Sequence, residues 1–208
     1  MTGNLALKGT LNIPIACKAI IVFSHGSGNS RFNPHNQSIA RYLNQHKFGT
    51  LLFDLLTEEE EARQNHSRFD IDLLTKRLIG ATRWLQYFPA SKNYRIAYFG
   101  AGTGAASALQ AAARLTEIFA VVSRGGRPDM TGEALQDVEA PTLLIVGSLD
   151  KAAVELNKKA FKELRCLKEL FVVEGATQLL EEKGTMEKME RLAVNWFEKY
   201  AMLVPAFS

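Results

Sequence analysis

The residues Gly100-Ala101-Gly102-Thr103-Gly104 form a turn with glycine at every second position. They keep the frame of the G-x-S-x-G turn, in which a strand passes sharply into a helix and presents a central serine as nucleophile. The central residue here is Gly102, so the frame is present and the nucleophilic atom is absent. Taken alone, such a turn equally suits a phosphate cradled at a helix N-terminus, or a turn without a ligand.

The residues around this turn predict the elements that hold it. An apolar run at 96–99 predicts a buried strand, and the alanine-rich segment after Gly104 predicts a helix that packs closely on a sheet. A serine at position 102 would store roughly 1–3 kcal/mol of backbone strain, whereas glycine adopts unusual backbone angles at no steric cost. Glycine is therefore what the loss of nucleophilic function would look like.

Strands and helices are predicted to alternate along the whole chain. The predicted strands are 19–23, 50–54, 96–99, 119–122, 142–147 and 169–173, with one or two edge strands inside 5–15. The predicted helices are 34–47 (with Gly49 as C-cap), 68–88, one from 104, a short one at 131–137, 153–164 and a final one near the C-terminus. This alternation predicts one α/β domain over 1–208, a mostly parallel sheet covered by helices on both faces.

Helical spacing predicts which side chains face the sheet. Inward-facing residues are expected to be Ile71, Leu74, Leu78, Ala81 and Leu85 in helix 68–88, Val154, Phe161 and Leu164 in helix 153–164, and Met186, Met189, Ala193, Trp196, Phe197 and Tyr200 in the last helix. Ligands of such folds bind outside the C-terminal ends of the strands. The loops with unusual chemistry all follow such ends.

Composition excludes several classes of partner. Lys and Arg number 25 against 22 Asp and Glu, and the net charge of +3 is dispersed, so we expect no nucleic-acid partner. No stretch reaches about 18 apolar residues and the N-terminus lacks a leader pattern, so we expect no membrane and a cytoplasmic location. Cys17 and Cys166 lack metal-ligand spacing, and we expect no metal and no cofactor.

Four strand-loop junctions carry a recognisable order: HGSG, GAGTG, VGSLD and EGATQ. Together with FSHGSGNSR, LLFDLLTEEEE, VVSRGGRPD, APTLLIVGSLD and GATQLLEE, this order resembles an α/β-hydrolase, and within that superfamily the small dienelactone-hydrolase-like members that lack a large cap domain. The resemblance covers nearly the whole chain.

The resemblance implies a catalytic triad in the order nucleophile, acid, histidine. The matching positions are Gly102, Asp150 and Gln178, so only the acid is kept. Glycine has no nucleophilic atom and an amide cannot accept a proton from a hydroxyl near neutral pH, so the triad is degenerate. Without a histidine, Asp150 has two readings: it caps the following helix or it binds Gln178. The oxyanion hole of the fold would use the backbone N–H of Thr103 and one near Gly26 and Ser27.

Three further features bear on ligands. His25 lies at the crevice and is a candidate ligand contact, although the histidine of this motif usually braces the loop. Arg124 could grip a carboxylate, and Arg127 could do the same or form an ion pair with Asp129. Asp54 and the glutamates 58–61 suit a solvated loop and helix start better than a cation site.

The sequence therefore predicts a pseudoenzyme that binds a small carbonyl or carboxylate ligand, or a partner. The alternative is an active ester or lactone hydrolase whose nucleophile is mutated here or lies elsewhere. A structural partner subunit is a third hypothesis, and it predicts a large exposed apolar patch.

Overall fold

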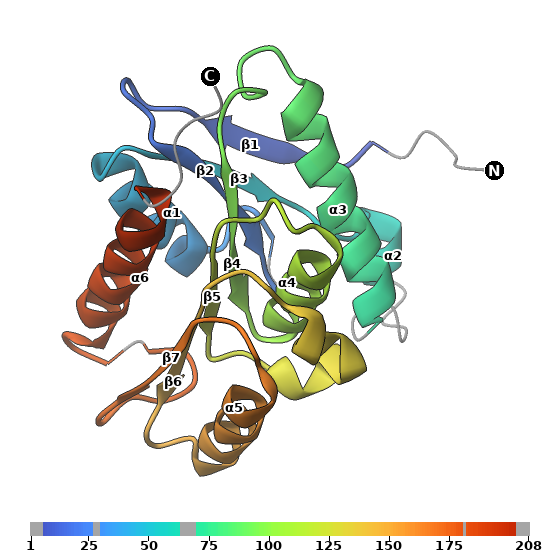
Figure 1. The fold of residues 1–208 in the computed structure, drawn as a ribbon. Coiled ribbons are helices and arrows are strands. Elements are labelled where there is room, and N and C mark those ends of the chain that lie inside the picture. The colour runs from blue at the N-terminus through green and yellow to red at the C-terminus, as the bar shows by residue number, and fades with distance from the viewer. Residues whose placement is uncertain (1–5, 27–29, 63–69, 181, 203–208) are drawn as a thin grey trace.

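The computed structural model describes residues 6–26, 30–62, 70–180 and 182–202. Its centre is a seven-stranded sheet in the order β1-β3-β2-β4-β5-β6-β7, parallel except for β1, which pairs antiparallel with β3 at one edge (Figure 1). The strands are β1 (Gly9–Asn12), β2 (Ala19–Ser24), β3 (Phe48–Phe53), β4 (Ile96–Ala101), β5 (Val121–Arg124), β6 (Thr142–Gly147) and β7 (Lys168–Val173). The predicted mostly parallel sheet is confirmed.

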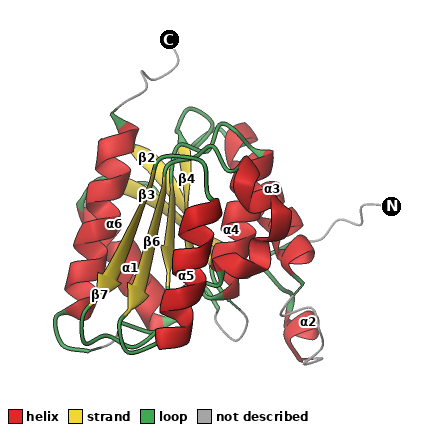
Figure 2. Cartoon of the chain, turned by 60° about the horizontal axis from the view of Figure 1, so that its bottom comes forward, coloured by secondary structure: helices red, strands yellow, loops and turns green. Residues whose placement is uncertain are grey.

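Helices cover both faces of this sheet, as predicted (Figure 2). They are α1 (Pro34–Gln45), α2 (Glu58–Ala62), α3 (Ile71–Tyr87), α4 (Thr103–Arg114), α5 (Lys151–Glu163) and α6 (Thr185–Ala201), with a 3-10 segment at Pro128–Asp137. The first and last, α1 and α6, pack on one face, and α3, α4 and α5 pack on the other. Each face has its own apolar core, as expected for parallel strands buried on both sides.

The two long helices bury most of the side chains that their spacing predicts, whereas Ala81 and Met186 are only half-buried. Leu74, Leu78 and Leu85 of α3 are buried, and so are Met189 and Phe197 of α6. Residues four apart lie on the same face of a helix, so this periodicity is decided locally.

The prediction for α5 is wrong in part. Val154 and Phe161 are only half-buried, and the inner face consists of Ala153, Asn157 and Ala160. The small alanines let α5 lie close to its neighbours, and the side-chain amide of Asn157 donates to the carbonyl of Gly126 at 3.2 Å. A polar residue is therefore buried here because it satisfies a backbone carbonyl of a distant turn.

The predicted C-cap at Gly49 is also wrong. The first helix ends at Gln45 with His46 as its C-cap, Lys47 takes a positive φ of 68°, and Gly49 lies inside β3. A Cβ at Gly49 would lie 3.1 Å from the carbonyl oxygen of Asn12 and 3.2 Å from the sulfur of Cys17. Glycine therefore serves close strand packing and not helix termination.

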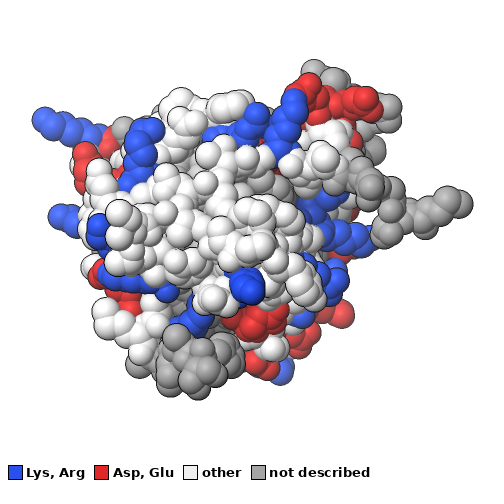
Figure 3. All heavy atoms as spheres, turned by 90° about the horizontal axis from the view of Figure 1, so that it is seen from above, with Lys and Arg blue, Asp and Glu red and all other residues white. Residues whose placement is uncertain are grey.

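Three aromatic side chains are exposed near the C-terminus of α3. Trp84 and Phe88 stack with ring centroids 4.7 Å apart, and Tyr87 lies beside them at helical spacing. Seen from above, this end of the molecule presents mainly uncharged atoms at its centre, with Lys and Arg mostly towards the edge (Figure 3). Within the described part of the chain, no helix combines the length and apolarity needed to cross a membrane.

Candidate ligand-binding site at the glycine elbow

Gly102 lies at the sharp junction between β4 and α4, where it is the N-cap of the helix. Its φ of 58° and ψ of −129° fall in a region that glycine reaches far more easily than other residues. A Cβ built on Gly102 would meet no atom within 4 Å. The backbone thus keeps the elbow geometry, which glycine adopts without strain, and a side chain at this position would enter space that no described atom fills.

The two outer glycines of the turn are required by packing. A Cβ at Gly100 would overlap the backbone of Ala105, and a Cβ at Gly104 would overlap the carbonyl oxygen of Ser24. Strand β2 and helix α4 therefore touch directly at this point. Gly100 and Gly104 therefore serve the close packing of strand and helix.

The N-terminus of α4 has no side-chain cap and no acidic residue in its first turn. Asn33, Asp70 and Asp150 cap the N-termini of α1, α3 and α5. The hydroxyl of Thr103, a residue only 8% exposed, has no hydrogen-bond partner among the residues that the structure describes. Because the first N–H groups of a helix carry a partial positive charge, this end of α4 favours an anionic or carbonyl oxygen.

Gly26 lies against Thr103, as the predicted oxyanion hole requires. A Cβ on Gly26 would lie 3.0 Å from the Thr103 hydroxyl oxygen and 3.3 Å from its backbone nitrogen. Ser27, the third residue predicted for this hole, lies outside the described residues. The pair Gly26 and Thr103 is therefore in place next to the elbow.

The turn after β5 joins the elbow to the loop after β7. The backbone N–H of Arg127 donates to the carbonyl of Gly102 at 3.0 Å, and the side-chain amide of Gln178 donates to the carbonyl of Gly125 at 3.3 Å. Two hydrogen bonds and the chain from Gly125 to Arg127 therefore connect Gln178 to Gly102. The Nε2 atom of Gln178 and the carbonyl oxygen of Gly102 lie roughly 13 Å apart at most. The first and last positions of the triad that the resemblance implies therefore lie close together, and their functional roles stay predictions.

Asp150 caps helix α5, which is the first of the two roles expected for it. Its carboxylate accepts a hydrogen bond from the N–H of Ala153 at 2.9 Å and so caps α5. The side-chain amide of Gln178 is directed to Gly125 instead. Acid and glutamine thus have separate structural partners, and the described contacts contain no nucleophile paired with a base.

Arg124 ends β5, in register with Ala101 of the elbow strand. Its side chain is buried, and its Nη1 donates to the carbonyl of Leu179 at 3.1 Å, which places the guanidinium between the elbow and the loop after β7. Arg127, in contrast, forms a two-bond ion pair with Asp129 at 2.9 and 2.7 Å, and the hydrogen bond from Arg127 lowers the pKa of that carboxyl. The ion pair considered for Arg127 is confirmed.

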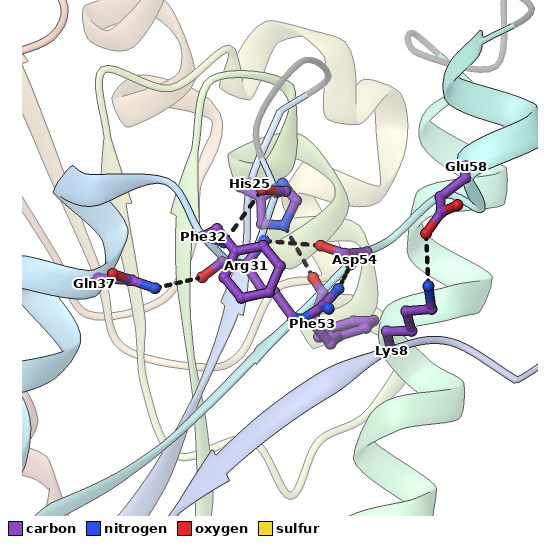
Figure 4. Close-up of polar contacts among 9 residues, drawn as sticks. Lys8, His25, Arg31, Phe32, Gln37, Phe53, Asp54 and Glu58 are labelled. Atoms are coloured by element: carbon purple, nitrogen blue, oxygen red, sulfur yellow. Dashed lines mark hydrogen bonds and ion pairs between the residues drawn. The ribbon is translucent and has the colours of Figure 1, made fainter.

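His25 braces the loop after β2. Its Nε2 lies 2.9 Å from the carbonyl of Phe53 and its Nδ1 lies 3.3 Å from the carbonyl of Gly26 (Figure 4). Burial lowers the pKa of the ring, so it stays neutral at pH 7, and its one N–H fits the shorter contact. The ring thus donates to the carbonyl of Phe53 through Nε2–H, and the proposed ligand contact of His25 stays a prediction.

The acidic residues near β3 have protein cations as partners. Asp54 accepts the backbone N–H of Arg31 at 2.8 Å and pairs with its guanidinium, and Glu58 pairs with Lys8 at 2.6 Å (Figure 4). The glutamates of 58–61 begin α2, as expected for acidic residues at a helix start. Asp54 and Glu58 thus form ion pairs with Arg31 and Lys8.

Sequence reasoning missed two buried polar residues beside the site. Asn157 holds the turn after β5 through Gly126, and the hydroxyl of Ser123 lies under the same turn without a hydrogen-bond partner in the described part of the chain. Asn157 lies seven residues after Asp150, the nearest motif residue, and Ser123 belongs to the VVSRGGRPD motif, where no role was predicted for it. Only the packing of α5 against the turn after β5 reveals Asn157, and only the approach of Gly126 reveals Ser123.

Known proteins resemble this chain over nearly its full length. A crystal structure of a dienelactone hydrolase from Anabaena variabilis is 46% identical, with a TM-score of 0.93, and the match covers 96% of this chain and 94% of that one. Est1E from Butyrivibrio proteoclasticus is 13% identical with a TM-score of 0.75 over 92% of this chain and 95% of its own, which shows the shared fold alone.

Longer relatives also exist. A protein of Mycobacterium tuberculosis with the name "Putative phosphoribosyl transferase" is 48% identical over 198 residues, which are 95% of this chain and 44% of the relative. This chain thus spans about half the length of the curated relatives it matches. The model of the dienelactone hydrolase family matches residues 7–177, and with the shared α/β-hydrolase fold this shows that the chain belongs to the dienelactone hydrolase family.

Proposed function

We propose that this protein is a catalytically degenerate member of its family that binds a small carbonyl or carboxylate ligand at the elbow. The observation that carries the proposal is Gly102, which keeps the elbow backbone while its Cβ direction is empty. Acyl transfer through this position needs an atom that attacks the carbonyl and a base that takes its proton. Gly102 supplies no such atom, and the amide of Gln178 supplies no base.

The parts of the site that stabilise an oxygen remain. The uncapped N-terminus of α4, the buried hydroxyl of Thr103 and the neighbouring Gly26 surround the place where an oxyanion would lie. The guanidinium of Arg124 adds a positive charge at the end of the adjacent strand. Such donors act on a bound carboxylate or carbonyl without any covalent step.

The test is a titration of propionate into ¹⁵N-labelled protein. We expect saturable shifts of the amide resonances of Thr103 and Gly104, and we expect Gly102→Ser to abolish them because its side chain occupies the ligand's space. Gly132→Ser is the matched control, because Gly132 also has a positive φ of 66° and an open Cβ direction but lies in the 3-10 segment. If propionate shifts neither amide resonance in the wild type, the proposal is refuted.

An active ester or lactone hydrolase is the alternative, favoured by the 46% identity to a protein named dienelactone hydrolase. It requires a nucleophile other than residue 102. Among nearby hydroxyls, Ser24 hydrogen-bonds Ser107 at 2.7 Å, and Thr103 has no described partner that could act as its base. Steady hydrolysis of p-nitrophenyl acetate by the wild type would favour this alternative.

A structural partner of a phosphoribosyl transferase is a second candidate. The mycobacterial relatives carry that name, and more than half of their length lies outside the match. The exposed aromatic cluster of Trp84, Tyr87 and Phe88 is the surface that such a partner would cover. Size-exclusion chromatography of this chain with a phosphoribosyl transferase from its own genome tests the idea, with Tyr87→Asp expected to abolish co-elution.

A further inference from the structure

Three apolar side chains are exposed on loops that follow the C-terminal ends of the parallel strands, the end of the sheet at which Gly102 lies. Phe32 follows β2, Leu149 follows β6 and Leu179 follows β7, and their exposed fractions are 61%, 61% and 49%. In the sheet order, β2 lies on one side of the elbow strand β4, and β6 and β7 lie on the other. The three side chains therefore flank the elbow from both directions.

The loops that carry these side chains are anchored. The carbonyl of Leu179 accepts the guanidinium of Arg124, and the N–H of Leu149 donates to the carbonyl of Ala176 at 2.9 Å. The ring of Phe32 lies 4.2 Å from the guanidinium of Arg31, which Asp54 holds. Single exposed apolar residues are common on protein surfaces, but these three are anchored and follow strands on both sides of one polar site, where the apolar part of a ligand could contact them.

The polar end of the site suits a carboxylate in particular. A carboxylate carries two oxygens on one carbon, as a tetrahedral acyl-transfer intermediate carries its serine oxygen and its oxyanion. One oxygen fits the empty direction beyond Gly102, where a serine oxygen would lie. The other would then lie at the N-terminus of α4, whose first residue, Thr103, has a buried hydroxyl without a hydrogen-bond partner among the described residues.

We infer that the ligand is a monocarboxylic acid with an apolar body, whose carboxylate takes the place of the missing serine side chain and whose body rests on Leu149 and Leu179. This inference rests on the proposed function and adds the class of ligand to it. It also predicts that a second carboxylate on the body is unfavourable, because the charge would lose water against apolar side chains.

The test compares, by NMR titration, monocarboxylic acids whose apolar part differs in size: acetate, butyrate, hexanoate and benzoate. Succinate, which has four carbons like butyrate, serves as the dicarboxylate. Affinity for the wild type should rise by roughly 2–4-fold per added methylene, as expected for burial of apolar surface. Succinate should bind more weakly than butyrate. Equal affinities across the series would overturn the inference while leaving the proposed function intact, and absence of binding by every acid would overturn both.

Two variants locate the apolar body. Leu149→Ala and Leu179→Ala should each weaken hexanoate by about 3–10-fold and acetate by less than 2-fold, because only the longer acid reaches these side chains. Leu167→Ala is the matched control. Leu167 is 65% exposed but precedes β7, so it lies at the N-terminal ends of the parallel strands, away from Gly102. An equal loss of hexanoate affinity in the control, or none in the two variants, would place the body elsewhere and overturn the inference.

Discussion

The side-chain amide of Gln178 donates a hydrogen bond to the carbonyl of Gly125 at 3.3 Å. Gln178 occupies the position where the family resemblance implies a catalytic histidine, and here it joins the loop after β7 to the turn after β5. Two residues further on, the N–H of Arg127 holds the carbonyl of Gly102. A position associated with proton transfer thus serves to fasten the site together.

The esterase behaviour of four proteins follows from this arrangement. The wild type should hydrolyse p-nitrophenyl acetate no faster than serum albumin, Gly102→Ser should gain little, and Gln178→His alone should gain nothing. The double variant should show an acyl-enzyme burst larger than the sum of the two single variants, because nucleophile and base act as one unit. The amount of p-nitrophenolate released in the burst, measured by its absorbance at about 400 nm, reports the covalent step.

The wild type provides the critical outcome. Saturable, steady turnover that survives Asp150→Ala would contradict a degenerate site and would show that another residue acts as nucleophile.

Gly102→Ala should lower the free energy of unfolding by roughly 1–3 kcal/mol because alanine is strained at a φ of 58°. Gly132→Ala should cost a similar amount, since both positions have a positive φ and an open Cβ direction. Only Gly102→Ala should weaken the binding of propionate. Urea denaturation and NMR titration measure the two effects, and unchanged binding by Gly102→Ala would contradict the placement of the ligand oxygen.

Arg124→Ala should weaken carboxylate binding by about 10-fold or more, as expected for the loss of a charge-assisted hydrogen bond. Arg127→Ala is the matched control, because Arg127 lies three residues away and is engaged by Asp129 on the surface. Circular dichroism shows whether both variants fold. Equal affinity of the wild type and Arg124→Ala would exclude Arg124 as a ligand contact.

Asp150→Ala should cost about 1 kcal/mol of stability because it removes the N-terminal cap of α5. Asp150→Asn and Asp150→Ser should remain within a few tenths of a kcal/mol of the wild type, since both side chains also cap helices. Thermal unfolding of the three variants measures this order. A loss in Asp150→Asn as large as that in Asp150→Ala would indicate a requirement for the negative charge.

Stability should fall in acid because of His25. Burial lowers its pKa in the folded protein below the ordinary value of 6.5, so the unfolded chain takes up a proton first. The free energy of unfolding should therefore be independent of this group above about pH 6.5 and decrease as pH falls towards the folded pKa. Urea denaturation of the wild type and His25→Asn between pH 5 and 8 isolates the effect, and parallel curves would show that His25 is not the titrating group.

The sequence by itself determined the features that depend on local order. Alternating apolar runs and amphipathic segments specify the parallel sheet, and the glycine turn specifies the elbow, because steric restriction acts between residues close in the chain. The ion pair of Arg127 with Asp129 and the cap formed by Asp150 span only two or three residues, so both could be foreseen.

Tertiary structure decided the rest. Gly49 looked like a helix C-cap, yet it serves the approach of β1 to β3, and Asn157 is buried because a turn 31 residues earlier needs its amide. The bond between Gln178 and Gly125 joins residues 53 apart in sequence. Such contacts exist only once the strands are ordered side by side, because burial then obliges each polar group to find a partner wherever the fold supplies one.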